Sequence, residues 1–305
     1  DWPACVADSG QYEPIEATIS TRARVDAFER IAVLLFDPAT PADPAAFINA
    51  RGIYQEDEGL DSRVVRRYDP HFPVEGEVDC GEAATVVREP EYCVGPAHLQ
   101  PLIIDALNAG AAGDGPSGHA ARVEAGLVWF LYVSAYKESL SCTEKAKDCD
   151  SSYAYYTGGE APARWKGLSR LVEEVSPEAN RAAYEGALAV RCWRDLDPDT
   201  PATDRFQRDL ARTQYDRAAL RGVILVMADR LATLRGVEGS VASYQRSFLG
   251  ALLPLLEVRA ASSAPAMLET LQALADASDW GAEQLDSLQA ALDMLADCDG
   301  VSSET

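Results

Sequence analysis

Tyrosine and glutamate side chains gather in the middle of the sequence. Five tyrosines fall within 25 residues, namely Tyr132, Tyr136, Tyr153, Tyr155 and Tyr156. Phenolate and carboxylate oxygens are hard donors, so a site built from them favours ferric ion over zinc or copper. On a helix, Tyr153 and Tyr156 face one point, whereas Tyr155 turns away. The spacing offers Tyr153 and Tyr156 as iron ligands, beside the alternative that the rings pack in the core with bonded hydroxyls.

Two glutamates lie on one face of the helix expected over residues 118–140. Glu124 and Glu138 are each seven residues from Leu131, so all three share that face. Fourteen residues of helix span about 21 Å, which places the two carboxylates in separate sites. A carboxylate at the edge of a buried helix needs a cation beside it. Each glutamate is therefore predicted either to pair with an arginine or to bind a metal ion.

Motifs of catalysis are missing from the sequence. It contains no Gly-x-Ser-x-Gly, no His-Glu-x-x-His and no phosphate-binding glycine loop. Gly118-His119 followed by Glu124 resembles the Gly-x-His-x-x-Glu motif of imelysin-type helical proteins. Here five residues separate His119 from Glu124, which turns them about 140° apart around a helix. We therefore expect no enzyme, and an imelysin-like protein of the peptidase type is the alternative.

The charge of the chain excludes several partners. Its 305 residues carry a formal net charge of -22 at pH 7. Nucleic acids and anionic membrane surfaces both require clusters of lysine and arginine, so neither is expected as a partner. Acidity suits a cation, but it equally keeps a protein soluble. A non-catalytic module whose acidic surface binds a partner protein is thus a further alternative.

Seven cysteines are spread singly, without the tight pairs of zinc sites. Cys80 with Cys93, and Cys142 with Cys149, are close enough to form local disulfides. Disulfides persist in oxidising compartments, so we expect a protein that is secreted, periplasmic or held at the cell surface. Seven reduced cysteines in a cytosolic protein are the alternative. The longest uncharged apolar run, residues 125–136, is shorter than the roughly 20 residues of a transmembrane helix, and no such segment is expected.

Helical periodicity dominates the chain, and no run alternates as a strand would. The predicted helices cover residues 15–36, 44–56, 60–67, 96–109, 118–140, 152–157, 161–175, 177–196, 201–235, 237–259, 265–277 and 280–298. Asp43, Ser117 and Ser176 are predicted to start helices, and Gly158 to end one. Residues 68–96 are expected to form an irregular stretch clamped by a disulfide. The fold class that follows is an all-α helical bundle stapled by disulfides.

The chain divides at a glycine-rich link. Residues 1–115 are predicted to form a first helical segment with the irregular loop, and residues 116–305 the main bundle, unless the two join in a single domain. Residues 126–133 resemble residues 222–229, which lie 96 positions later. This similarity predicts two pseudo-repeated bundles packed together, with ligands gathered between them, or else a chance likeness of two apolar helices.

Four segments carry a family resemblance. Residues 152–159 read Ser-Tyr-Ala-Tyr-Tyr-Thr-Gly-Gly, and residues 187–192 read Ala-Leu-Ala-Val-Arg-Cys. Tyr136-Lys137-Glu138 stands near the end of one helix, and residues 237–255 run from Val-Glu-Gly through Tyr244 to Leu-Pro-Leu. Together these segments resemble the low-iron-inducible periplasmic protein family, the iron-assimilation proteins of green algae and diatoms.

This resemblance implies a helical, exported protein that captures iron as Fe3+ or Fe2+ and passes it to a membrane uptake system. Its motifs carry over five metal ligands, namely Glu138, Tyr153, Tyr156, Glu238 and Tyr244. The helix geometry adds Glu124. The family usually has a second cysteine soon after the Arg-Cys pair, and residues 193–199 contain none, so Cys192 is expected to need a distant partner.

Overall fold

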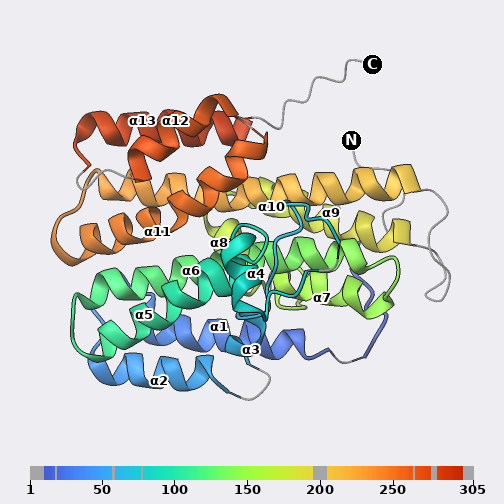
Figure 1. The fold of residues 1–305 in the computed structure, drawn as a ribbon, viewed down its shortest axis with the longest axis horizontal. Coiled ribbons are helices and arrows are strands. Elements are labelled where there is room, and N and C mark those ends of the chain that lie inside the picture. Colours follow the sequence, from blue (N-terminus) through green and yellow to red (C-terminus); the bar gives the residue numbers. More distant parts are fainter. Residues whose placement is uncertain are drawn as a thin grey trace.

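The computed structural model describes residues 10–17, 19–56, 59–76, 78–194, 205–263, 265–275 and 280–297. Within these ranges every regular element is a helix, and none is a strand, which confirms the predicted all-α fold. Most of the helices lie nearly along the long axis of the molecule (Figure 1). In chain order the elements are α1 (Thr21–Leu35), α2 (Pro44–Tyr54), α3 (Asp61–Val64), α4 (Ala83–Arg88), the π-helix η1 (Gly95–Leu99), α5 (Gln100–Ala111), α6 (Pro116–Ser141), α7 (Ala146–Thr157), α8 (Leu168–Val175), α9 (Pro177–Arg194), α10 (Arg205–Leu234), α11 (Gly239–Ser263), α12 (Pro265–Ala275) and α13 (Ala282–Asp297).

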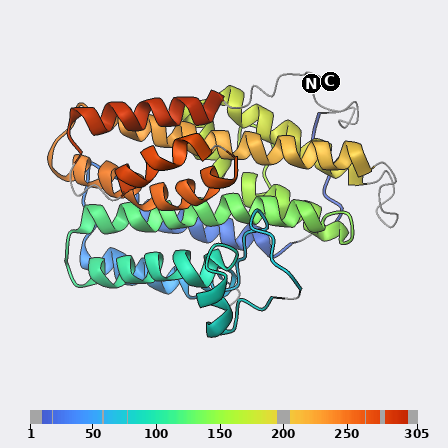
Figure 2. The same cartoon turned by 45° about the horizontal axis from the view of Figure 1, so that its top comes forward.

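Helix α6 forms the centre of the fold. In both views it runs between α1, α2 and α5 on one side and α10 to α13 on the other (Figures 1 and 2). Every residue of its middle, 123–135, is buried, as expected for a helix that is apolar nearly all round. Gly126 lets α5 come close, because a Cβ there would lie 2.7 Å from the side chain of Ile103.

Local signals set several helix ends as predicted. The Asp43 carboxylate accepts a hydrogen bond from the Ala46 N–H at 2.8 Å and caps α2. The Ser176 hydroxyl accepts one from the Ala179 N–H at 3.2 Å and starts α9. Gly158 ends α7 in the left-handed conformation, with φ of 76°.

Other boundaries were predicted wrongly. Helix α1 begins at Thr21 rather than at residue 15, because the chain before it is held by α7 instead of coiling. Ser117 does not cap α6; Gly115 occupies that position with a positive φ of 36°, and Pro116 follows as the first helical residue. Helix α7 starts earlier than expected and α8 later, and α4 interrupts the stretch expected to be irregular.

Both predicted local disulfides are present. Cys80 bonds to Cys93 and Cys142 to Cys149, with Cα separations of 5.4 and 4.5 Å. Cys192 is disulfide-bonded as well. Cys5 and Cys298 lie outside the described residues. Across the described ranges, no helix is both long and apolar enough to span a membrane.

The expected division of the chain falls between α5 and α6, which pack against each other. Helix α1 also contacts α6 and α7, so the first segment lies directly on the second. The two similar segments belong to α6 and α10. A Cβ at Gly222 of α10 would lie 2.8 Å from Val172, much as one at Gly126 would meet Ile103. Two pseudo-repeated bundles stay a prediction.

Candidate functional site

Glu124 is buried in the core and pairs with an arginine. Its side chain is 1% exposed, Arg230 Nη2 of α10 lies 2.9 Å from Oε1, and the Tyr244 hydroxyl of α11 donates to Oε2 at 2.7 Å. The Arg230 guanidinium also lies over the Phe248 ring at 5.2 Å. Two of the six predicted ligands, Glu124 and Tyr244, are thus brought together, but a protein cation shares their site.

The protonation of these groups bears on iron. Burial raises the pKa of Glu124, although Arg230 and Tyr244 act against it. Burial, and then the charge of Glu124, raises the pKa of Tyr244 well above its usual value. A tyrosinate ligand must lose its proton, so a ferric ion would have to overcome both this raised pKa and the nearby charge of Arg230.

Tyr153 and Tyr156 do not face one point. The Tyr156 hydroxyl, fully buried, donates to Asn180 Oδ1 at 3.0 Å. The Tyr153 hydroxyl donates to the carbonyl of Glu160, and its ring stacks on Tyr12 at 3.8 Å. Both rings therefore pack in the core with hydrogen-bonded hydroxyls, which was the alternative to their acting as iron ligands.

Glu138 and Glu238 lie apart from the other predicted ligands. Glu138, near the end of α6, is 3.4 Å from Arg67 Nη1 and 3.1 Å from Lys137 Nζ. Glu238 precedes α11 and is exposed. Within the described ranges, no group of three or more His, Cys, Asp or Glu side chains is arranged to hold a metal ion.

Glu138 instead lines a cavity of about 480 Å³ at the start of α1, which we call the α1 pocket. Its cationic side chains come from four parts of the chain: Arg24, Arg63, Lys137, Lys145 and Lys147. Its carboxylates are Glu16, Glu138 and Asp148. The lining thus carries more positive than negative side chains, in a chain whose net charge is -22. That local excess of positive charge favours an anion.

The guanidinium of Arg24 is only partly satisfied by hydrogen bonds to the described residues. The residue is 2% exposed, and its Nε and Nη2 atoms have no hydrogen-bond partner among the described residues. Burial lowers the pKa of Arg24; Tyr155 opposes this shift, and the like charges of Arg63 and Arg67 add to it. A buried donor without an acceptor is costly. Both nitrogens are closed to solvent, so a small shift of the surrounding side chains would let a ligand oxygen in the α1 pocket accept from them.

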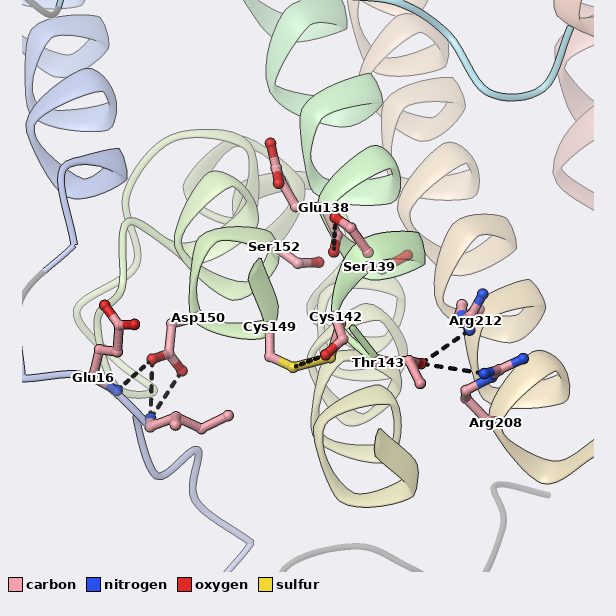
Figure 3. The surroundings of a disulfide bond; sticks show 12 residues. Glu16, Glu138, Ser139, Cys142, Thr143, Cys149, Asp150, Ser152, Arg208 and Arg212 are labelled. Atoms are coloured by element: carbon pink, nitrogen blue, oxygen red, sulfur yellow. Dashed lines mark hydrogen bonds between the residues drawn. A yellow bond between two sulfur atoms is a disulfide. The ribbon is translucent and has the colours of Figure 1, made fainter. Parts of the chain in front are cut away.

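The first turn of α1 opens onto the same pocket. Ile19, Ser20 and Thr21 line it, and no side chain caps the helix at Ser20. The free N–H groups and dipole of a helix N-terminus attract anions. Asp150 of α7 fixes the chain before this turn, because its carboxylate accepts from the N–H groups of Ile15 and Glu16 at 2.8–3.1 Å (Figure 3).

A disulfide fixes the opposite wall. Cys142 and Cys149 join the end of α6 to the start of α7 (Figure 3). Lys145 and Lys147 lie between the two cysteines, Lys147 already in the first turn of α7. Thr143, also between the cysteines, accepts hydrogen bonds from Arg208 and Arg212 of α10. Both lysines are exposed and line the α1 pocket. The disulfide therefore holds two exposed cations at the pocket.

A second polar cluster holds the chain between α3 and α4. His71 lies between two carboxylates, with Nδ1 2.6 Å from Asp69 and Nε2 3.0 Å from Asp216 of α10. Asp216 also accepts from Tyr132 and Arg259, each at 2.8 Å. Although burial lowers it, the two carboxylates raise the pKa of His71 above its usual value. Since both ring nitrogens face carboxylates in a buried site, this cluster anchors the segment to the core.

Arg24 was not among the predicted site residues, although a signal for it was present. Positions 24, 28, 31 and 35 follow helical spacing, and Phe28, Ile31 and Leu35 are buried. An arginine that continues an apolar stripe must meet an acceptor or a ligand.

Comparisons with protein-family models, with curated proteins and with solved structures each found no match.

Proposed function

We propose that the protein binds a small oxyanion in the α1 pocket and does so outside the cytosol. The observation that carries this proposal is the pair of unpartnered nitrogens on Arg24, which is buried and lines the cavity. Guanidinium groups recognise carboxylate and phosphate oxygens through a planar fork of donors. The disulfides support the location, since such bonds persist in oxidising compartments.

The pocket has the features of a binding site rather than a catalytic one. Its guanidinium and ammonium groups bind and orient negative charge, and the uncapped end of α1 adds to this field. Its most buried cation, Arg24, is flanked by Arg63, Arg67 and Tyr155. The arginines and Tyr155 are not ready nucleophiles or general bases near neutral pH, and the lining carboxylate Glu138 is paired with Arg67 and Lys137. We therefore propose capture and release of the anion without chemical change.

Replacing Arg24 with methionine should lower the affinity for the bound anion by about tenfold or more, because a hydrogen bond to a charged group contributes about 1.5–3 kcal/mol. Isothermal titration calorimetry with acetate, phosphate and citrate in turn, in a buffer free of oxyanions, measures this. The stability should not fall, because methionine replaces a guanidinium that has unsatisfied donors.

The matched control is Arg22→Met, which removes the same charge from an exposed position on the same helix. It should leave the affinity nearly unchanged. If none of the three anions binds, or if Arg24→Met binds as the native protein does, the proposal fails. A large loss of stability with unchanged binding would instead assign Arg24 to the core.

Iron capture, which the family resemblance implies, is a second candidate. The contact between Glu124 and Tyr244, two predicted ligands 120 residues apart, favours it. Arg230 is 16% exposed, so its guanidinium can turn toward solvent and leave the carboxylate to a cation. Water or a bound anion would have to complete the coordination. The iron would then be handed to a membrane uptake system.

On this candidate, Fe(III) added to the metal-stripped protein should raise its melting temperature and produce a visible tyrosinate–iron band. Tyr244→Phe should abolish both effects, because it removes the phenolate but keeps the ring. Tyr156→Phe should not, since that hydroxyl binds Asn180. An unchanged spectrum and melting temperature with the native protein would end the iron proposal while leaving anion binding untouched.

A further inference from the structure

We infer that the ligand of the α1 pocket carries several carboxylate groups, one held by Arg24 and another by the lysines of the Cys142–Cys149 turn. This inference rests on the proposed anion binding and names the class of anion. It is carried by the distribution of lysine, by the depth of the cations in the pocket and by the size of the cavity.

Lysine is rare in this chain and concentrated at this pocket. Only four of the 27 basic residues are lysines, and three of them, Lys137, Lys145 and Lys147, line the α1 pocket. The fourth, Lys166, forms ion pairs with Asp26 and Glu160. Everywhere else the protein uses arginine for positive charge. A flexible ammonium can follow ligand groups in several positions, whereas arginine needs a fixed fork geometry.

The cationic side chains of the α1 pocket differ in how deeply they are buried. Arg24 is 2% exposed and forms part of the floor, whereas Lys145 and Lys147 are exposed at the rim. An anion with one charged group can satisfy only one of these places. The cavity of about 480 Å³ is many times the roughly 30 Å³ that one water molecule occupies, so it admits a molecule with several carbon atoms.

The carboxylates of the lining decide between classes of anion. Glu16, Glu138 and Asp148 face the same cavity, and they repel the dense charge of a phosphate group. Singly charged carboxylates spread along a carbon chain can avoid them. A hydroxyl on the same chain would donate to their oxygens. The probe that combines these features is citrate, which has three carboxylates and one hydroxyl.

Calorimetry with citrate and acetate tests the inference. Citrate should bind at least about tenfold more tightly than acetate, because it reaches both sets of cations. The double variant Lys145→Gln/Lys147→Gln should bring the affinity for citrate close to that for acetate, and should weaken acetate binding much less than citrate binding. Lys166→Gln is the control, since it removes one ammonium group away from the pocket and should change neither affinity.

Reductive methylation gives a second readout, because four lysines are simple to follow by mass spectrometry. Citrate should slow the methylation of Lys145 and Lys147 but not that of Lys166. If citrate and acetate bind equally and both depend on Arg24, anion binding stands and this inference is overturned. Phosphate binding more tightly than citrate overturns it as well. If no anion binds at all, both proposals fall together.

Discussion

Asp216→Asn should lower the free energy of unfolding by about 3–5 kcal/mol and the melting temperature by roughly 10 °C. The substitution keeps the shape of the side chain but leaves Arg259 and His71 buried without their shared carboxylate. Removing one partner from a buried charged group costs more than the group contributed, because the remaining charge stays desolvated. Urea unfolding followed by circular dichroism at 222 nm measures the change.

Asp209→Asn is the control for this substitution, since Asp209 lies on the same helix and pairs with Arg208 and Arg212 at the surface. Asp209→Asn should change the free energy of unfolding by no more than about 1 kcal/mol.

The difference in free energy of unfolding between the native protein and Asp216→Asn should also depend on pH. The raised pKa of His71 means that its attraction to Asp216 is complete below about pH 6.5 and is lost as the pH rises through the raised value. A gap that widens with rising pH would contradict this.

Arg230→Met should also lower the free energy of unfolding by about 3–5 kcal/mol, because it leaves the Glu124 carboxylate buried without a cation. Glu124 is 1% exposed, so in the metal-free variant water can replace the guanidinium only in part. The double variant Glu124→Gln/Arg230→Met should regain much of the loss, since no charge is then left in the core. Chemical unfolding of the four proteins in this cycle gives the coupling directly.

Arg235→Met, in the turn directly after the same helix, provides the comparison. Arg235 pairs with Asp286, whose side chain is 72% exposed, and the loss should be at most about 1 kcal/mol. If Arg230→Met lowers the free energy of unfolding as little as Arg235→Met does, Glu124 would have to be neutral in the folded protein. A double variant no more stable than Arg230→Met would show that packing, rather than charge, explains the loss.

Local features of the sequence were sufficient to predict the fold class and several helix ends. Asp43 before Pro44 and Ser176 before Pro177 are short-range signals, and each caps a helix in the structure through a contact within three residues. The boundary of α1 depended on a distant group. Residues 15 and 16 are held by Asp150, which is more than 130 positions away, and no periodicity in residues 15–36 reports this contact.

The candidate site was predictable only in part, for the same reason. Spacing placed Glu124 and Glu138 in separate sites, and the structure agrees. Their partners, Arg230 and Arg67, lie 106 and 71 residues away, and 27 basic residues gave no means of choosing among them. The tyrosines near residue 153 attracted attention by their density, yet burial gave each hydroxyl its own partner. The α1 pocket was not predicted, although the clustering of three of the four lysines within residues 137–147 is visible in the sequence.

The three polar contacts along α6 have a mechanical consequence. Glu124, Tyr132 and Glu138 each bind a group from another part of the chain: Arg230 and Asp216 of α10, and Arg67 after α3. A slip of α6 by one turn would carry each side chain about 5.4 Å from its partner and leave buried charge unmatched. Shear between α6 and its neighbours is thereby blocked at three points. The exposed side chains of the lining, such as Lys145 and Lys147, do not belong to this locked register, so they are the part of the pocket left to adjust when a ligand enters.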